Sequence, residues 1–418
     1  MVRENKQQLV WGIIICTIAA IFYCYEYLLR IIPGAIQPEL RQAFGNITAT
    51  AFGNLTAYYY YAYTPMQLPV GMLMDRFGPK RLLFIACLLC ALGSAMFTYT
   101  PSIYIAGLGR FLVGFGSAFA FVGVLSLTHA WLPRKYFSMV AGIVTTLAMA
   151  GAIAGEVGIT WLASDYGWKA ILYGTALFGV LLTLVIFFFV KDSPEGHQVE
   201  VLSRTDFFRD VIKVMTSLQV WIIGIVGSLL YLSLSVFAEV WGQTYLRVVH
   251  NLSALDAAKA VSMVFFGWAI GAPLAGAISD WTGRRIMLLV VGAVMGAICI
   301  SAVLYMPTLS ITNIKLLLLF YGIFSSTEII IFIMGKENCD ARLAGTAFAV
   351  VNMIVMLGGA ILQPMVGIML DSVWTGGMAD NARVYSAADF QIVLSVLPLG
   401  LLAVAILAFF LRENSSNE

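Results

Sequence analysis

The feature that most limits the fold of this chain is a series of long apolar runs. A helix that crosses the hydrocarbon core of a bilayer needs about 20 apolar residues, and segments of about that length follow one another along the sequence. They are 9–33, 48–73, 82–99, 103–129, 138–164, 169–190, 218–243, 255–278, 286–307, 313–334, 345–370 and 389–411. The sequence therefore predicts an all-α polytopic membrane protein with twelve transmembrane helices.

The composition excludes the soluble classes of protein. Of the 418 residues, 61% are hydrophobic and 11% are charged, whereas soluble domains have about 25% charged residues. The net charge of +2 gives no reason to expect binding to nucleic acid. The six cysteines show no metal-ligand spacing, and no Walker loop or Gly-x-Ser-x-Gly motif occurs. We therefore expect neither an enzyme nor a cofactor or metal site.

Lys and Arg are distributed unevenly between the two sets of connecting segments. If the N-terminus is cytoplasmic, 16 of the 24 Lys and Arg fall on the cytoplasmic side and 6 on the outer side, while Arg30 and Arg110 fall within spans. An excess of Lys and Arg is typical of cytoplasmic loops. The sequence therefore predicts that both termini are cytoplasmic.

Two stretches of the chain repeat at one fixed offset. The segment Gly71–Arg81, GMLMDRFGPKR, is similar to Gly276–Ile286, GAISDWTGRRI, which begins 205 residues later. The same offset relates the triplet NIT, which ends at Thr48, to NLS, which ends at Ser253. Thr48 and Ser253 are expected to cap the helices that follow them.

The repeat predicts how the chain is divided. The matches are Gly71 with Gly276, Asp75 with Asp280, Gly78 with Gly283, and NIT with NLS. Four matches at one offset indicate two homologous halves of six helices each, at 1–190 and 217–418. The one long polar internal segment, 191–216, lies between them and is expected to be a cytoplasmic linker.

The segment GMLMDRFGPKR resembles the signature loop between spans 2 and 3 of the major facilitator superfamily, and the weaker copy at Gly276–Ile286 fits the loop between spans 8 and 9. The resemblance covers the whole chain. It implies two pseudo-symmetric six-helix bundles around a central cavity, with a solute bound at mid-membrane and alternating access by rocking of the bundles.

The resemblance also implies a gating role for the residues of these loops. In that family the Asp and Arg of the loop join the two bundles at the cytoplasmic side. The matching residues are Gly71, Asp75, Arg76, Gly78, Lys80 and Arg81 in the first copy and Asp280, Gly283 and Arg284 in the second. Pro79 departs from the basic residue that is usual there. The alternative is that the loop only sets the topology.

Within the superfamily, YEYLLR followed by YYYYAYTPMQLPVG is similar to the proteobacterial intraphagosomal transporters, and more distantly to the lysosomal dipeptide carriers. The first likeness implies import of amino acids and related nutrients across a bacterial inner membrane. Pro65 and Pro69 in this stretch are expected to bend the cytoplasmic half of span 2.

Charged residues inside the spans mark candidate functional positions, because they are costly there and face a bundle interior or water. In the superfamily, spans 1, 4, 7 and 10 line the cavity. The charges well inside spans are Glu26 and Arg30 in span 1, Arg110 in span 4, Glu156 in span 5, Glu239 in span 7 and Glu328 in span 10.

Span 1 carries a polar face. Tyr23, Glu26, Tyr27 and Arg30 follow the spacing i, i+3, i+4, i+7 and so share one side of a helix. Glu26 is then able to take a proton or a solute amine, and Arg30 a solute carboxylate. The alternative is a structural ion pair that fixes span 1 against its neighbours.

Spans 7 and 10 each place a carboxyl beside polar groups. Tyr231, Ser235 and Glu239 share one face of span 7, and Tyr321 and Glu328 share one face of span 10. Desolvation disfavours the ionised form of such a carboxyl, so Glu239 and Glu328, with Glu26, are candidates for proton coupling. The alternative is a packing role through hydrogen bonds to Tyr or Ser.

The remaining candidates lie in spans 2, 4, 5 and 11. Tyr61 in span 2 and Asn352 in span 11 are possible cavity residues. Arg110 is either a cavity residue or a helix-end residue whose side chain extends to the outer interface. Glu156 follows Gly151 and Gly155, a small-residue face that favours close helix packing, and its role is left open.

Together these features predict a secondary active transporter of a small organic solute, an amino acid or a short peptide, driven by protons. The expected partners are the solute, the proton and the bilayer, and we expect a monomer. An organic-anion or sugar-phosphate carrier is the alternative, although phosphate usually needs two converging cations. A sensor that keeps the fold without transporting is a third possibility.

Overall fold

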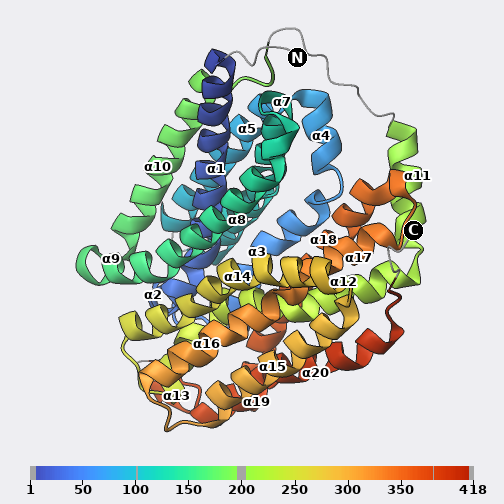
Figure 1. Cartoon of the computed structure of the whole chain (residues 1–418). Coiled ribbons are helices and arrows are strands. Elements are labelled where there is room, and N and C mark those ends of the chain that lie inside the picture. Colours follow the sequence, from blue (N-terminus) through green and yellow to red (C-terminus); the bar gives the residue numbers. More distant parts are fainter. Residues whose placement is uncertain (1–5, 100–101, 195–203, 380, 414–418) are drawn as a thin grey trace.

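The computed structural model describes residues 6–99, 102–194, 204–379 and 381–413, and almost all of them are helical (Figure 1). Eleven helices in the described residues are long and apolar enough to cross a membrane. This confirms an all-α polytopic membrane protein. The remaining predicted span, 48–73, is present as two shorter helices.

The first group of helices runs from α1 to α10. Its elements are α1 (Lys6–Ala35), α2 (Gln37–Ala43), α3 (Ala49–Met66), α4 (Val70–Phe77), α5 (Pro79–Tyr99), α6 (Ile103–Ser117), α7 (Ala120–Trp131), η1 (Arg134–Tyr136), α8 (Phe137–Ile153), η2 (Ala154–Gly158), α9 (Ile159–Tyr166) and α10 (Trp168–Phe189).

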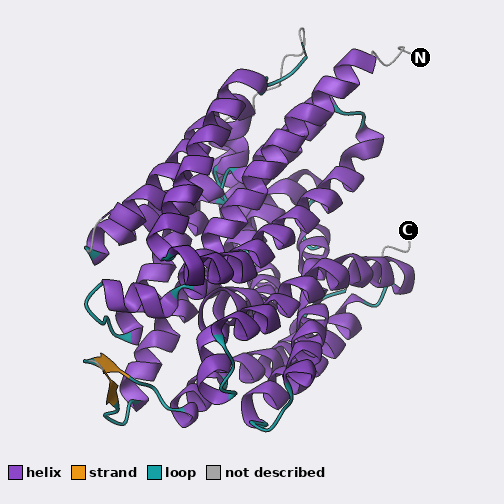
Figure 2. Ribbon diagram, turned by 90° about the vertical axis from the view of Figure 1, so that its left-hand side faces the viewer, coloured by secondary structure: helices purple, strands orange, loops and turns teal. Residues whose placement is uncertain are grey.

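The second group runs from α11 to the end of the described chain. Its elements are α11 (Arg204–Met215), α12 (Leu218–Leu232), η3 (Ser233–Trp241), α13 (Gly242–Val249), α14 (Ala254–Thr282), α15 (Arg285–Tyr305), α16 (Ile311–Ser325), η4 (Ser326–Ile329), α17 (Ile330–Glu337), η5 (Ala341–Leu343), α18 (Ala344–Val373), α19 (Ala387–Leu394), α20 (Val396–Leu407) and η6 (Ala408–Phe410). A short hairpin of β1 (Met378–Ala379) and β2 (Ala382–Arg383) follows α18 (Figure 2).

The predicted second span is broken at its prolines. Helix α3 ends at Met66, directly after Pro65, and α4 starts after Pro69. Proline removes a backbone donor and clashes with the preceding turn, which explains the interruption. The helix α3 still packs along its length between α6 of its own group and α18 of the other group.

Asn46 and Asn251, which the 205-residue offset relates, both have positive φ, at 59° and 52°. Gly78 and Gly283 also share a positive φ, at 79° and 65°, but their ψ angles differ, at 144° and 4°. The two predicted N-caps are confirmed. Thr48 accepts a hydrogen bond from the Ala51 amide, and Ser253 accepts one from the Asp256 amide. The turns before α3 and α14 therefore match in φ and in their N-caps, whereas the loops at Gly78 and Gly283 share only the positive φ.

The two groups meet where α3 packs on α18, α1 on η3, and α8 and η2 on α14. Glycines allow backbones to approach closely there. A Cβ atom at Gly34 of α1 would clash with the Glu239 carbonyl oxygen, and one at Gly53 would lie 2.7 Å from the Gln363 carbonyl oxygen. A larger residue at either position would separate the groups.

Hydrogen bonds between the groups gather where α2, α13 and the β-hairpin lie, which we call the hairpin end. The Thr50 amide at the start of α3 donates to the Asp371 carboxylate at 2.8 Å, and the Ala49 amide donates to the Tyr385 hydroxyl at 3.0 Å. Burial, and the hydrogen bond to Asp371, raise the pKa of Tyr385 to about 12, so this hydroxyl stays protonated and donates to Asp371. These hydrogen bonds close the hairpin end between α3 and the second group.

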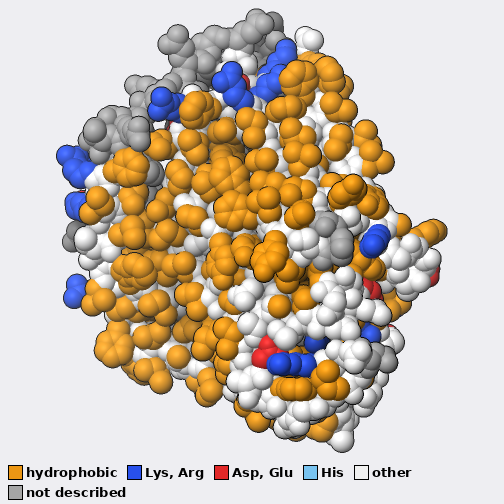
Figure 3. All heavy atoms as spheres, turned by 180° about the vertical axis from the view of Figure 1, so that it is seen from behind, with side chains coloured by type: hydrophobic (Ala, Val, Ile, Leu, Met, Phe, Trp, Pro, Cys, Tyr) orange, Lys and Arg blue, Asp and Glu red, His pale blue; other side chains and the backbone are white. Residues whose placement is uncertain are grey.

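The opposite end, which holds α4, α11 and both chain ends, is called the termini end. There α4 packs mainly against α5 and α7, and α11 packs mainly against α12 and α18, each within its own group. Figure 1 shows the two groups diverging toward this end. Figure 3 shows Lys and Arg side chains at the rim on that side and hydrophobic side chains over the middle of the surface.

The contact of Gly34 with the Glu239 backbone leads to a first prediction. Gly34→Ala places a methyl group against a carbonyl oxygen and is expected to hold the hairpin end partly open, reducing transport at least tenfold. The increased access of a water-soluble thiol reagent to a cysteine at Thr244 measures the opening. Gly174→Ala, with nothing within 4 Å of the new Cβ atom, is the matched control. Unchanged access in Gly34→Ala would refute the packing argument.

Candidate solute site

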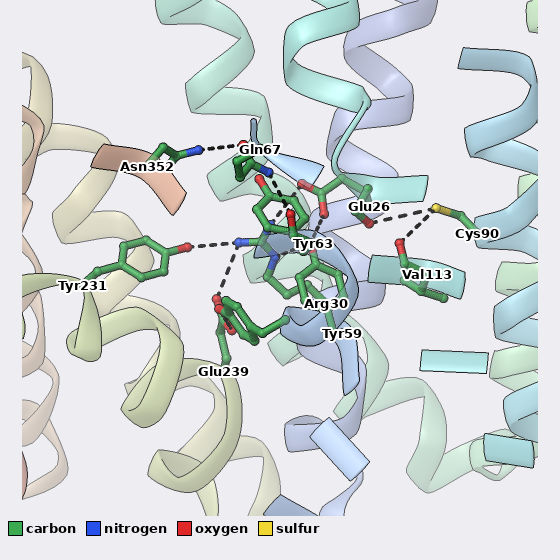
Figure 4. Close-up of polar contacts among 12 residues, drawn as sticks. Glu26, Arg30, Tyr59, Tyr63, Gln67, Cys90, Val113, Tyr231, Glu239 and Asn352 are labelled. Carbon is green, nitrogen blue, oxygen red and sulfur yellow. Dashed lines mark hydrogen bonds and ion pairs between the residues drawn. The ribbon is translucent and has the colours of Figure 1, made fainter. Parts of the chain in front are cut away.

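Arg30 is the centre of a buried polar cluster between the two groups (Figure 4). It lies near the C-terminal end of α1 and is 2% exposed. The guanidinium donates to the Tyr59 hydroxyl through Nε at 2.9 Å and Nη2 at 2.6 Å, and to the Tyr231 hydroxyl through Nη1 at 3.0 Å. Since Tyr59 lies on α3 and Tyr231 on α12, this one cation is bound by both groups.

Two carboxylates flank the guanidinium, one from each group. Glu26 Oε1 lies 3.5 Å from Arg30 Nη2, and Glu239 Oε1 lies 3.9 Å from Arg30 Nη1. Each carboxylate also accepts a hydrogen bond from a tyrosine of α3, Glu26 from Tyr59 at 3.0 Å and Glu239 from Tyr60 at 2.7 Å. A buried charge requires such partners, because ionic groups out of water cost several kcal/mol each when unpaired.

Aromatic rings surround the rest of the guanidinium. The Arg30 Cζ atom lies 4.4 Å from the ring centroid of Tyr27 and 4.9 Å from those of Tyr59 and Tyr63. The negative faces of such rings stabilise a cation. Tyr23 packs edge-to-face on Tyr27 at 5.2 Å. The face predicted for span 1 is therefore present as one continuous surface.

Arg110 is buried behind the cluster and does not extend to the interface. From α6, it donates to the Leu29 carbonyl at 2.9 Å and the Arg30 carbonyl at 3.4 Å, and it lies 5.2 Å from the Tyr59 ring centroid. It thus holds the backbone of α1 at Arg30. Its contacts are to α1 and Tyr59, which makes it a residue that positions the cluster.

Other predicted residues lie around the cluster. Asn352 of α18 donates to Gln67 at 2.8 Å, which joins the groups on the termini side of Tyr63. Ser235 donates to the Tyr231 carbonyl, one turn earlier in the same helix. Tyr321 packs against Phe237 within the second group. Glu328 lies buried in η4, among helices of the second group.

The expectation for Tyr61 is wrong. Its side chain is 42% exposed and packs edge-to-face on Tyr58, on the outer side of α3. The neighbours Tyr59 and Tyr63 point into the cluster instead (Figure 4), and Tyr60 donates to Glu239. Four consecutive tyrosines give no periodicity, so the sequence alone does not fix which of them faces inward. The partners of Glu26 and Glu239 were missed for this reason.

Helix geometry is irregular at several of the intramembrane carboxyls. Glu239 lies in the π-helical segment η3, Glu156 in the π-helical segment η2, and Glu328 in the 3₁₀ segment η4. Such segments inside α-helices are frequent at functional sites. They release backbone groups from the regular ladder and change the direction of the side chain, which sequence periodicity does not reveal.

The predicted gating residues lie at the termini end. Asp75 and Arg76 are in α4, and Asp75 is half-buried near His129 of its own group. The Lys80 amide donates to the Asp192 carboxylate at 2.7 Å, against which Gly78 also packs. Gly71, Arg81, Asp280, Gly283 and Arg284 lie on the same side of the molecule, at the ends of α4, α5, α14 and α15. In this conformation no ion pair between Asp75 or Arg76 and the second group is present among the described residues.

The sequence model of the Major Facilitator Superfamily matches residues 12–363. The chain belongs to this superfamily. It is therefore a membrane transporter and not an enzyme, and the predicted fold is confirmed. A crystal structure of a bacterial homolog of the human lysosomal transporter Spinster, inward-facing and occupied, superposes with a TM-score of 0.77 at 16% identity, over 94% of this chain and 95% of that one.

Curated relatives of this superfamily member are transporters of different solutes. The probable sulfoacetate transporter SauU of Cupriavidus necator is 23% identical, over 88% of this chain and 89% of that protein. The lysosomal dipeptide transporter MFSD1 of Danio rerio is also 23% identical, over 84% of this chain and 77% of that protein. The cis,cis-muconate transport protein of Acinetobacter baylyi is 22% identical over 82% and 81%.

The Tyr59 hydroxyl, shared between Arg30 and Glu26, gives a second prediction. Tyr59→Phe leaves a carboxylate oxygen and the guanidinium short of a partner, which is expected to lower the free energy of unfolding by about 1–3 kcal/mol. The midpoint of thermal unfolding in detergent measures the loss. Tyr61→Phe, on the exposed side of the same helix, is the control and should leave the midpoint unchanged. Equal effects of the two changes would show that the cluster contributes no stability.

Proposed function

We propose that the chain transports a small zwitterionic solute, an amino acid or a short peptide, in exchange for or together with protons. The observation that carries the proposal is one buried guanidinium between two carboxylates from different helix groups. A zwitterion brings the complementary pair of charges. Its carboxylate fits Arg30, and its amine fits Glu26 or Glu239.

The solute is expected to replace contacts that the protein now makes with itself. Arg30 lies 3.5 Å and 3.9 Å from its two carboxylates, which is longer than an optimal charge-assisted hydrogen bond of about 2.7–2.9 Å. A solute carboxylate that binds Arg30 at the shorter distance weakens the link to Glu239. Because that link joins the two groups, solute binding changes the balance between closed and open arrangements.

Proton binding is coupled to solute binding through the carboxyls that the solute releases from Arg30. A carboxylate that loses its guanidinium partner in a buried site is more stable with a proton. We propose Glu26 and Glu239 as the groups that bind the proton, since they contact Arg30 directly. Glu328, in the second group, is a further candidate that would act through η4 and α14.

The direction of access follows from the two ends of the molecule. We propose that the termini end is cytoplasmic, in a bacterial inner membrane, and that residues 1–190 and 217–418 move as two bodies. The excess of Lys and Arg on that side supports the assignment. The groups are joined at the hairpin end and diverge toward the termini end (Figure 1), so we propose that the buried cluster gains access to the cytoplasm. The loops at Asp75 and Asp280 would then meet across the groups when that side closes.

A carrier of organic anions is the second candidate. Relatives named for sulfoacetate and cis,cis-muconate support it, and one Arg surrounded by tyrosine hydroxyls is able to bind a carboxylate or sulfonate. This alternative requires both Glu26 and Glu239 to be protonated when the solute is bound, because two nearby carboxylates would repel an anion.

Uptake into proteoliposomes tests the two candidates. With an inward proton gradient, we expect uptake of amino acids or dipeptides well above that of organic dianions. Arg30→Lys should reduce uptake at least tenfold, because an ammonium cannot bind two tyrosine hydroxyls and a carboxylate in the guanidinium geometry. Arg412→Lys, near the chain end, is the control. Preferential uptake of sulfonates or dicarboxylates would favour the second candidate.

A separate measurement tests proton coupling. Glu239→Gln keeps the size of the side chain but does not titrate. We expect it to retain exchange of internal for external solute while uptake driven by the pH gradient falls at least tenfold. Full gradient-driven uptake in Glu239→Gln would remove this residue from the coupling mechanism.

A further inference from the structure

Glu156 is a buried carboxyl that the solute site does not use. Its side chain is 1% exposed, and both of its carboxyl oxygens are enclosed without a hydrogen-bond partner among the described residues. It lies in η2, the π-helical segment between α8 and α9. An ionised carboxylate in this position would lack any compensation for the loss of water.

The position of η2 relates Glu156 to the closure of the hairpin end. The segment packs against α1 on one side and against α14 of the second group on the other. A Cβ atom at Gly155 would lie 3.0 Å from Ile31 of α1. One turn further, Thr160 donates to the Glu156 carbonyl at 2.6 Å and accepts from Gln243 of the second group at 3.1 Å. Separation of the groups at this end would therefore uncover η2.

The charged groups on the surrounding helices have other partners or are exposed. On α1, Glu26 and Arg30 bind each other, Tyr25 donates to the Thr175 carbonyl, Tyr23 packs on Tyr27, and Cys24 lies against Gly151 of α8. On α9, Asp165 and Tyr166 are exposed. On α14, Asp256 is bound by Ser253, and Lys259 and Asp280 are exposed. The helix α8 carries no titratable side chain. Among the described residues no cation pairs with Glu156.

We propose that Glu156 is a proton-binding site, separate from the solute site, that controls opening of the hairpin end. Its carboxyl is neutral while η2 is packed between α1 and α14, and it ionises when the two groups separate and water enters. This control of opening is separate from solute binding, since it acts when no solute is bound.

The sign of the pH dependence follows from the proton count. The closed hairpin end holds one proton more than the open one above about pH 4.3, where a solvated Glu ionises. Acid therefore favours the closed arrangement. Each rise of one pH unit shifts the ratio of open to closed by up to tenfold toward open.

Distances between spin labels across the hairpin end test the proposal in the solute-free protein in lipid nanodiscs. The labels are placed at Tyr166→Cys in the first group and Met306→Cys in the second, both exposed. Cys24 and Cys339 are replaced by Ala, since the other four cysteines are buried. Between pH 5.5 and pH 8.5 we expect the fraction with long distances, relative to short ones, to rise at least tenfold.

Variants at Glu156 separate this site from the other carboxyls. Glu156→Gln should stay closed, with less than a twofold change over the same pH range, and Glu156→Asp should keep the pH response. Asp165→Asn removes a charge from an exposed position nearby and should show the same pH response as the protein that retains Asp165. An intact pH response in Glu156→Gln would overturn the proposal, and so would a background protein that shows no pH response.

Discussion

The structure depends on the burial of one cation, the guanidinium of Arg30, where the two helix groups meet. A charge in that position is tolerated only with partners, and these come from both groups: Tyr59 and Glu26 from the first, Tyr231 and Glu239 from the second. The same contacts that compensate the charge therefore also join the groups. A solute that competes for Arg30 necessarily acts on the way the groups are held together.

The remaining architecture supports this arrangement. Arg110 fixes the backbone of α1 at Leu29 and Arg30, and the π-helical segment η3 carries Glu239 toward the first group. At the hairpin end, Asp371 holds the first turn of α3, while Gly34 lets α1 approach the backbone at Glu239. Closure at that end and the geometry of the cluster are thus parts of one interface.

Much of the fold is predictable from the sequence, because its physical causes are local or periodic. Apolar length defines eleven of the spans, and the 205-residue offset finds loops whose backbones match at Asn46 and Asn251. The face of Tyr23, Glu26, Tyr27 and Arg30 follows from helical spacing alone. The break in span 2 follows from Pro65 and Pro69. Span 2 is not among the eleven apolar helices, because its sequence is polar and rich in tyrosine.

The partners of Arg30 are not predictable from the sequence, because they depend on tertiary packing. Nothing in the run Tyr58–Tyr61 distinguishes the inward Tyr59 and Tyr60 from the outward Tyr61, and helical periodicity fails where η2 and η3 depart from the α-helix. The contact between Arg30 and Glu239 joins residues 209 positions apart in different halves, a separation over which no pattern in a single sequence carries information.

A structure with the transported solute bound would test the central claim most directly. The account predicts a carboxylate of the solute within hydrogen-bond distance of the Arg30 guanidinium, and Glu239 displaced from Arg30 beyond the reach of an ion pair. A solute bound elsewhere, with Arg30 still between Glu26 and Glu239 as it is here, would contradict it.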